Sequence, residues 1–327
     1  MTSTSPSTDL LASALAAGLV TAREAAEGVV AVRGAALQLH GRTIAYARAA
    51  EPENRELSCL RLLDDTGLVP EVLRGGAGDV VWTEAIRGTR LSDLTGTMAE
   101  LADACQAWGA ALAALHLTRI EVGSRPPVSP LPWVLDPDRL PRSMRHAPAG
   151  SARAHVLRTL RVDRGLARTT SRVADRWSAD HWIHGDLTAT RVLVQQLPDL
   201  RVRFVDLRGG GLGDPVWDLA GALDTITELS TGARARWGSA SERCLSDYLL
   251  QGYRRAGGTA VVDAGTRALR LVARAWDAAV SQDARANHPA SMHPAVGLPS
   301  EATRLSERLA AARELAARSA RPGLVAA

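Results

Sequence analysis

The most informative part of the sequence is WIHGDLTATRVLVQQLPDLRVRFVDLRGGGLGDPVWDLAGAL, residues 182–223. Apolar residues on both sides of His184-Gly185-Asp186 predict a strand that runs into a turn, because glycine accepts backbone conformations that other residues avoid. The runs VLV (192–194) and RVRFVD (201–206) predict two paired strands, and the second of them ends in Asp206. Asp186 and Asp206 are therefore predicted to leave neighbouring strand ends on the same side.

Two carboxylates in this arrangement suit the transfer of a phosphoryl group. One carboxylate accepts or orients the attacking hydroxyl, and the other holds the metal ion that neutralises the triphosphate. A single aspartate beside a glycine is usually a turn residue. Here two strand ends, a run of glycines and the turn Gly213-Asp214-Pro215 occur in order, and the whole arrangement favours a phosphotransferase centre.

Short apolar runs before residue 87 predict a small β-sheet. Residues 10–27 have the apolar spacing of a helix, and glycines then separate short β-prone runs, as expected of hairpin turns. A second helix is predicted over 53–65 from its apolar period. The predicted strands are VVAVRG (29–34), AALQLH (35–40), TIAYARA (43–49) and DVVWTEAI (79–86).

Helical periodicity replaces this pattern near Gly88. Helices are predicted over 91–117, 151–176 and most of 215–327, with a proline-rich loop at 123–150 and a break at 287–299. This order of elements argues against a doubly wound sheet, in which strands and helices alternate throughout. We therefore predict an α+β fold of two lobes. Its parts are a disordered tail (1–9), a small antiparallel β-rich N-lobe of about five strands (10–87), and a larger helical C-lobe (88–327) containing a catalytic loop (182–194) and a metal-binding segment (204–220).

The composition is that of an ordinary globular protein, with 46% apolar and 23% charged residues in a chain of 327. We find no long apolar run, no signal peptide and no basic run interleaved with aromatic residues, so we expect a cytoplasmic protein that binds neither membrane nor nucleic acid. The three cysteines are odd in number and widely spaced, which fits a reducing compartment. All 39 basic residues are arginine, so any function that a lysine usually performs falls to arginine or is lost.

The ordered motifs around the two aspartates resemble the signature of the aminoglycoside phosphotransferase and choline kinase family. The resemblance implies a bilobal protein-kinase-like fold with ATP and Mg²⁺ bound in its cleft. It implies Asp186 as the catalytic base, next to His184 in the catalytic loop, and Asp206 as the metal ligand. The motifs are His184-Gly185-Asp186-Leu187, Val192-Leu193-Val194, Val205-Asp206, Gly213-Asp214-Pro215 and Asp218-Leu219-Ala220, in which Asp218 would be a structural carboxylate.

The resemblance extends upstream, over roughly residues 29–225 in all. Glu56 is placed like the glutamate of the first N-lobe helix of that family, and Trp82–Gly88 looks like the linker between the lobes. It implies that backbone groups of Glu84 and Ile86 pair with adenine.

Two departures from the family pattern bear on activity. Arg191 stands where the family has an asparagine as second metal ligand, and a guanidinium cannot coordinate a cation. Arg191 would contact a phosphate directly, prevent activity, or form a salt bridge such as one to Asp206. The family's nucleotide-binding lysine is also missing. Arg48 is the nearest substitute for pairing with Glu56, with Arg42 and Arg33 as alternatives, and we find no convincing glycine-rich phosphate loop.

The acceptor is constrained by charge and aromatic content. From Leu219 to the end there are 14 arginines against 10 acidic residues, which argues against a polycationic aminoglycoside. Choline would need an aromatic cage, and only 4% of the residues are aromatic. Tryptophans 133, 217, 237 and 276 of the C-lobe are interpreted as core residues.

The tract 206–218, together with PLPWVLDP at 130–137, resembles phosphotransferase-like proteins of class V lanthipeptide and thioamitide pathways. That resemblance implies phosphorylation of Ser or Thr in a precursor peptide, after which a partner protein eliminates the phosphate. The competing hypothesis is a pseudokinase that serves as a binding or scaffolding subunit. Arg191 and the missing lysine favour the pseudokinase, whereas the retained Asp186 and Asp206 oppose it.

Overall fold

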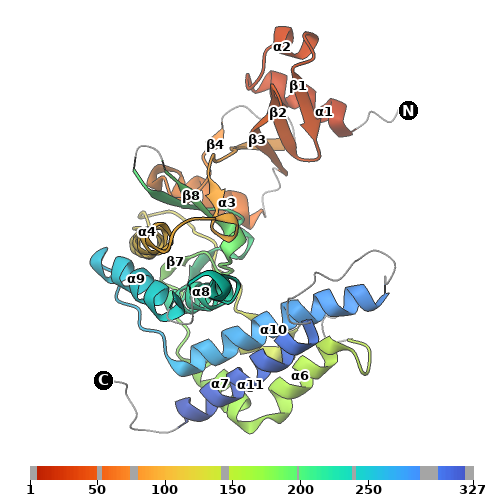
Figure 1. Cartoon of the computed structure of the whole chain (residues 1–327). Coiled ribbons are helices and arrows are strands. Elements are labelled where there is room, and N and C mark those ends of the chain that lie inside the picture. The colour runs from red at the N-terminus through yellow and green to blue at the C-terminus, as the bar shows by residue number, and fades with distance from the viewer. Residues whose placement is uncertain are drawn as a thin grey trace. The chain divides into compact units, whose positions relative to one another are not determined.

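Figure 1 shows the chain as a computed structural model. The structure describes residues 6–49, 54–73, 80–140, 147–196, 199–237, 241–287 and 301–320. The chain forms two compact units, each built from three separate segments. Unit 1 comprises 1–129, 181–212 and 229–259, and unit 2 comprises 130–180, 213–228 and 260–327.

The N-terminal part of unit 1 is a five-stranded antiparallel sheet in the order β1-β2-β3-β5-β4. Gly34 and Gly41 make the two hairpin turns with φ of 57° and 74°, which is the left-handed region that glycine adopts without steric cost. The prediction of about five strands is thus confirmed, and four of them match the predicted runs, whereas β4 lies outside those runs. The strands are β1 (Val30–Arg33), β2 (Ala36–Leu39), β3 (Arg42–Ala49), β4 (Val72–Leu73) and β5 (Val80–Glu84).

Two helices precede this sheet where the sequence predicts one. Gly18, with φ of 69°, separates α1 (Pro6–Ala16) from α2 (Ala22–Ala26). α1 packs on the sheet, and the Trp82 indole of β5 donates a hydrogen bond to the Ser13 hydroxyl at 3.3 Å. α1 begins at Pro6, so the predicted tail is helical from that residue, and residues 1–5 lie outside the described part.

The rest of unit 1 contains helices and short strands. α3 spans Arg55–Leu63, and the predicted helix 91–117 is confirmed as α4 (Met98–Leu117) after a single turn. β6 (Thr89–Arg90), β8 (Val192–Gln195) and β9 (Arg201–Phe204) form a three-stranded antiparallel sheet, and β7 (His181–Ile183) pairs with β10 (Gly211–Gly213). The predicted pairing of 192–194 with 201–206 is therefore confirmed.

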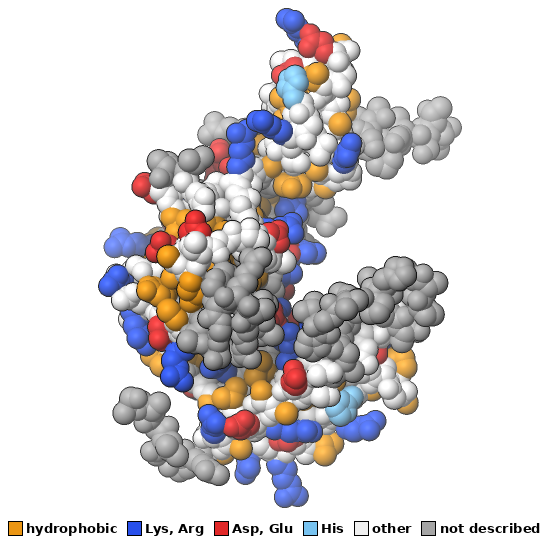
Figure 2. Space-filling model, in the orientation of Figure 1, with side chains coloured by type: hydrophobic (Ala, Val, Ile, Leu, Met, Phe, Trp, Pro, Cys, Tyr) orange, Lys and Arg blue, Asp and Glu red, His pale blue; other side chains and the backbone are white. Residues whose placement is uncertain are grey.

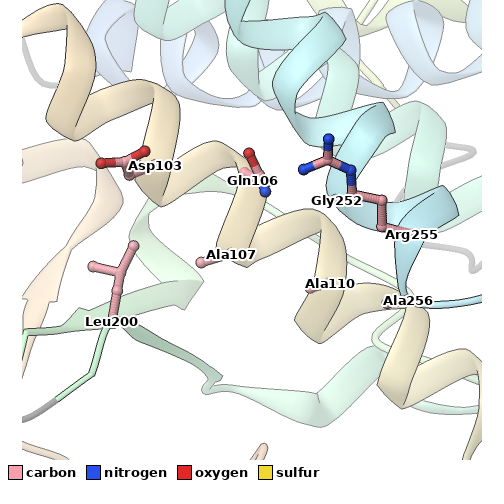
Figure 3. A pocket seen from close by; sticks show the side chains of 8 residues that line it. All are labelled: Asp103, Gln106, Ala107, Ala110, Leu200, Gly252, Arg255 and Ala256. Atoms are coloured by element: carbon pink, nitrogen blue, oxygen red, sulfur yellow. The ribbon is translucent and has the colours of Figure 1, made fainter.

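Helices α4 and α9 (Ser241–Arg255) pack closely through two glycines. A Cβ atom on Gly109 would lie 2.0 Å from the Leu249 carbonyl oxygen, and one on Gly252 would lie 2.0 Å from the Gln106 carbonyl oxygen. Only glycine therefore allows this approach. An open pocket of about 540 Å³ lies beside the contact (Figure 3). It is lined by Asp103, Gln106, Ala107, Ala110, Leu200, Gly252, Arg255 and Ala256.

Unit 2 is a helical unit with its own apolar core. Asp163 ends the first half of the predicted helix 151–176 and caps the second half, accepting bonds from the Gly165 and Leu166 amides at 2.9 and 3.0 Å. The predicted proline-rich loop contributes Val134 and Leu135 to the core. The helices are α6 (Ala152–Val162), α7 (Arg164–Asp175), the start of α8 (Pro215–Trp237), α10 (Ala264–Asn287) and α11 (Glu301–Ser319). The predicted break at 287–299 lies, after Asn287, outside the described residues.

Charged side chains also enter the interior of unit 2. Arg270 is 3% exposed and its guanidinium lies 4.7 Å from the Trp217 ring, a cation–π contact. Burial raises the pKa of Asp224 on α8 to about 6, although three arginines of α10 oppose this rise. On the surface, basic side chains are scattered over the face shown in Figure 2.

The predicted α+β class, with antiparallel sheets followed by mostly helical structure, is confirmed. The predicted boundary between lobes at residues 87 and 88 stays a prediction, because the two compact units divide the chain at other positions. Among the described residues, no helix combines the length and the apolar character needed to cross a membrane.

Candidate active site

The turn after β7 brings Asp186 against the segment that follows Asp206. Gly185 has φ of 79°, and a Cβ atom there would lie 2.1 Å from the Gly209 carbonyl oxygen. Gly209 belongs to the single turn η6 (Leu207–Gly209), and the Ser129 hydroxyl donates to its carbonyl oxygen at 2.8 Å. The close contact explains why this motif has glycine between His184 and Asp186.

His184 is fully buried and bonds to the backbone of both aspartate segments. The Asp186 amide donates to His184 Nδ1 at 3.3 Å, so Nδ1 is the acceptor and Nε2 carries the proton. Nε2 then donates to the Val205 carbonyl oxygen, 2.9 Å away. His184, which the sequence places in the catalytic set, therefore has the geometry of a positioning residue.

Arg191 joins the two predicted catalytic carboxylates. Its Nε lies 2.9 Å from Asp206 Oδ2, and its Nη1 forms an ion pair with Asp186 Oδ2. The same Nη1 donates to the Asp186 carbonyl oxygen at 2.7 Å. Of the alternatives for Arg191, the salt bridge to Asp206 is present in this structure, and it includes Asp186 as well.

Arg208 is the second guanidinium partner of Asp206, and none of the sequence motifs predicts this contact. Its Nε and Nη2 lie 2.5 and 3.0 Å from Asp206 Oδ1 and Oδ2, which is the bidentate geometry of a strong charge-assisted pair. This hydrogen bond, reinforced by the Arg191 charge, lowers the pKa of Asp206, while partial burial acts in the opposite direction. The same bond raises the pKa of Arg208.

Asp206 also has an unusual backbone conformation. Its φ and ψ of 64° and 57° lie in the left-handed region, which costs energy for a residue with a Cβ atom, although aspartate tolerates it better than most. This conformation turns the chain from β9 into η6. It places Arg208 where its guanidinium reaches back to Asp206.

Arg48 is the arginine that pairs with Glu56. The Glu56 side chain is 7% exposed, and its Oε1 lies 3.5 Å from Arg48 Nη2. Arg33 ends β1 and Arg42 begins β3, and both are exposed, so Arg48 is the one of the three that lies beside Glu56, while its role as the replacement for the nucleotide-binding lysine stays a prediction. α3, which carries Glu56, packs against η6, which carries Arg208. The negative charges of Glu56 and Asp186 accordingly add to the rise in the pKa of Arg208.

The predicted adenine-binding residues lie at and after the end of β5. The Glu84 carboxylate is paired with Arg203 of β9, at 3.0 and 2.8 Å. The Glu84 amide donates to the Glu71 carbonyl oxygen at 2.9 Å. The side chain of Glu84 is therefore structural, and the pairing of the Glu84 and Ile86 backbone with adenine stays a prediction.

The residues of the predicted metal site do not fit Mg²⁺ in this arrangement. Magnesium needs free oxygen ligands in near-ideal octahedral geometry. Guanidinium nitrogens hold both oxygens of Asp206 and one oxygen of Asp186, and Arg191 replaces the expected asparagine. Within the described ranges, no group of three or more His, Cys, Asp and Glu side chains is arranged to hold a metal.

The last two aspartates of the motif lie in unit 2. Asp214 precedes α8 and accepts a bond from the Val216 amide at 2.9 Å, while burial raises its pKa. Asp218, in the first turn of α8, is 1% exposed. Both positions are consistent with the structural role that the resemblance implies for Asp218.

Comparison with known proteins identifies the family of the chain. Residues 29–258 match the model of the phosphotransferase enzyme family (APH), so the chain belongs to that family. No curated protein matches the sequence significantly.

Solved structures share the fold at low identity. A choline kinase of Streptococcus pneumoniae is 14% identical with a TM-score of 0.52, over 88% of this chain and 89% of that one. A putative aminoglycoside phosphotransferase of Ralstonia eutropha JMP134 gives the same four values. An ethanolamine kinase of Plasmodium vivax is 12% identical with a TM-score of 0.51, over 91% and 85%. The predicted kinase-like fold is thereby confirmed.

Proposed function

We propose that this protein transfers the γ-phosphoryl group of ATP to a hydroxyl group, with Asp186 as the base. The observation that carries the proposal is the meeting of Asp186 and Asp206. They leave different strand ends, yet one guanidinium contacts both carboxylates. The family of the chain supports the same reaction class.

The chemistry follows from the groups at this centre. As the acceptor oxygen forms its bond to the γ-phosphorus, the bond to the ADP oxygen breaks and the hydroxyl proton passes to Asp186. The Asp186 side chain is 46% exposed, so an acceptor can reach it. Arg48, Arg191 and Arg208 supply cationic N–H donors, and guanidinium groups match phosphate oxygens bidentately.

The test measures ATP binding by calorimetry and ADP formation with a panel of hydroxyl acceptors. Asp186→Asn should leave ATP affinity within a few-fold but lower turnover by about 10²-fold or more, because positioned base catalysis contributes that much. Asp199→Asn, in the exposed loop before β9, makes the same chemical change away from the centre and should have no effect. Equal turnover in the Asp186→Asn variant would refute the assigned role.

A pseudokinase is the second candidate, and the guanidinium contacts of Asp186 and Asp206 favour it. In that case the closed network of Arg191 and Arg208 excludes the nucleotide, and the fold serves as a binding subunit of a biosynthetic complex. Absence of ATP binding, both with and without Mg²⁺, together with absence of ADP formation would support this candidate over the enzyme.

For the acceptor, we propose a Ser or Thr of a precursor peptide that contains an acidic segment. Unit 2 has 19 arginines against 15 acidic residues, whereas unit 1 has 20 of each, so the whole net charge of +4 belongs to unit 2. Trp217 and Trp276 are 3% and 5% exposed and belong to the core, as predicted, so neither presents a face for a quaternary ammonium. The Trp237 side chain lies outside the described residues.

A basic pocket of unit 2 supports the peptide acceptor. It encloses about 690 Å³ where the end of α6, the start of α7 and α11 meet. Arg158, Arg164 and Arg313 line it together with His155, and its single carboxylate, Asp163, already pairs with Arg313 at 3.3 Å. Arg158 and Arg164 form no ion pair within the described ranges, so their charges remain available to acidic side chains.

Paired synthetic peptides test this acceptor. A Ser/Thr peptide with an acidic segment should be phosphorylated, as seen by mass spectrometry, and a peptide with lysines in that segment should not. Arg158→Ala with Arg164→Ala should raise the KM for the acidic peptide and leave its kcat unchanged. Equal use of both peptides would refute the acidic class. In this proposal, a partner protein eliminates the phosphate from the phosphorylated peptide.

A further inference from the structure

We infer that Arg191 and Arg208 take the place of a divalent metal, so that this centre binds a nucleoside triphosphate without Mg²⁺. The inference rests on the proposed ATP site and states which charges of the chain meet the phosphates. Its starting point is the poor fit of the predicted metal site to a metal ion.

The balance of charge is the first step. Three carboxylates lie in this region, those of Glu56, Asp186 and Asp206. Carboxylates alone would repel a triphosphate, and a metal ion would be needed to reverse the sign. Here each carboxylate has a guanidinium partner, from Arg48, Arg191 and Arg208. The set is neutral before any metal binds, so the repulsion that a metal would relieve is already absent.

The number of hydrogen-bond donors is the second step. A guanidinium has five N–H donors, all in one plane. Among the described residues, the contacts of Arg191 use its Nε and Nη1, which leaves the Nη2 donors. In the same part of the chain, the contacts of Arg208 use Nε and one Nη2 donor, which leaves the Nη1 donors and the other Nη2 donor. Both groups therefore keep donors for phosphate oxygens while Asp206 holds them in place.

Exposure is the third step. The side chain of Arg208 is 73% exposed and that of Arg191 is 23% exposed, whereas Asp206 is 25% exposed. The Arg208 side chain is thus more accessible to a ligand than the Asp206 carboxylate that orients it, while Arg191 is about as exposed as Asp206. A metal ion would reach Asp206 only after displacing contacts from both arginines. A phosphate can bind the remaining donors of these arginines without displacing their contacts to Asp206.

Asp206 consequently has a different task from the one that the sequence predicts. It orients two guanidinium groups by accepting hydrogen bonds on both of its oxygens, and it does not ligate a metal. The chain contains no lysine. Arginine is also the better residue for this task, since its planar fork presents paired donors to carboxylate and phosphate alike.

The experiment titrates ATP into the full chain by calorimetry, once with excess EDTA and once with excess Mg²⁺. The two dissociation constants should agree within about threefold. Arg208→Ala and Arg191→Ala should each weaken binding in EDTA by about tenfold, the loss of one charge-assisted contact. Arg201→Ala removes the same charge from an exposed position at the end of β9 that lies away from Asp206, and it should leave the affinity unchanged. Melting temperatures within a few degrees of wild type would show that the variants are folded.

A second readout uses no nucleotide. The electron paramagnetic resonance signal of free Mn²⁺ should not change on addition of the wild-type protein. It should fall with the Arg191→Asn, Arg208→Ala double variant, because Asp186 and Asp206 are then released and the asparagine supplies an oxygen ligand. Mn²⁺ binding by the wild type would overturn the inference.

The outcomes separate this inference from the proposed function. ATP binding only in Mg²⁺ would overturn the metal-free site and leave phosphoryl transfer standing. Binding in EDTA that the Arg208→Ala variant weakens supports the inference, whatever the turnover of Asp186→Asn. Absence of ATP binding in both buffers would overturn the inference and the proposed function together.

Discussion

Replacing Gly109 by alanine tests how the close contact between α4 and α9 contributes to stability. The new Cβ atom would lie 2.0 Å from the Leu249 carbonyl oxygen and 2.7 Å from the Tyr253 amide nitrogen. Real Cβ atoms essentially never approach other atoms within 3.0 Å, and both obstructing atoms belong to the backbone. No rotamer change relieves the clash, so the helices must separate by at least 1 Å at this point.

The cost follows from the contacts that this separation weakens. A buried side chain such as Leu249 makes roughly 40–60 atom contacts of ~0.1–0.2 kcal/mol, and a gap near 1 Å forfeits at least about a quarter of them, or roughly 1–3 kcal/mol. Tyr253 loses a similar amount. The hydrogen bond between His116 Nδ1 and the Tyr253 hydroxyl, 2.9 Å long, adds about 1 kcal/mol. The higher helix propensity of alanine, compared with glycine, offsets ~1 kcal/mol of this loss. The net loss should be at least about 2 kcal/mol.

Urea unfolding followed by tryptophan fluorescence measures this loss. Ala110→Ser is the matched control, because it adds one heavy atom on the same helix but at a position that lines the open pocket of Figure 3. The control should change the free energy of unfolding by less than about 1 kcal/mol. A Gly109→Ala protein within about 0.5 kcal/mol of wild type would show that the helices do not depend on this contact.

Three further predictions concern other parts of the chain. Because burial raises the pKa of Asp224 to about 6, above the ~3.9 of an unfolded chain, the folded state binds the proton more tightly. The free energy of unfolding should therefore fall by about 2 kcal/mol as the pH rises from 4 to 7, and Asp224→Asn should flatten that profile. Gly185→Ala should abolish ADP formation because its Cβ meets a carbonyl oxygen at 2.1 Å, and an active variant would contradict the geometry. Burial raises the pKa of Cys59 and Cys105 to about 12, so iodoacetamide at pH 8 should modify only Cys244 in the folded protein, as mass spectrometry can show.

The sequence predicted the parts of the site that backbone pattern determines. Two β-prone runs end in aspartates, and the strands that follow from them bring Asp186 and Asp206 together. Glycine at position 185 marked the turn, and the structure shows the close backbone contact that requires it. Such features depend on local preferences that a single chain segment contains.

Other features depend on distant contacts and on side-chain direction. The bond from Arg208 to Asp206 depends on the left-handed backbone of Asp206, which no periodicity reveals. Arg48 could be selected over its alternatives only once the strand placed it beside Glu56. β4 and β6 have two residues each, too few for any alternation to appear. The burial of Val134 could not be predicted, because prolines and other turn residues surround the short apolar run in which it lies.

The interleaving of the two units has a consequence for biosynthesis of the chain. The backbone passes from one unit to the other five times, at 129, 180, 212, 228 and 259. The hairpins β1 to β3 have only local contacts and can form soon after they leave the ribosome. Unit 1, however, lacks α9 until residue 255 has been added, and unit 2 lacks α10 and α11 for longer still. Both units therefore remain incomplete, with apolar faces exposed to solvent, until most of the polypeptide has been translated. Neither unit can be produced as one continuous fragment.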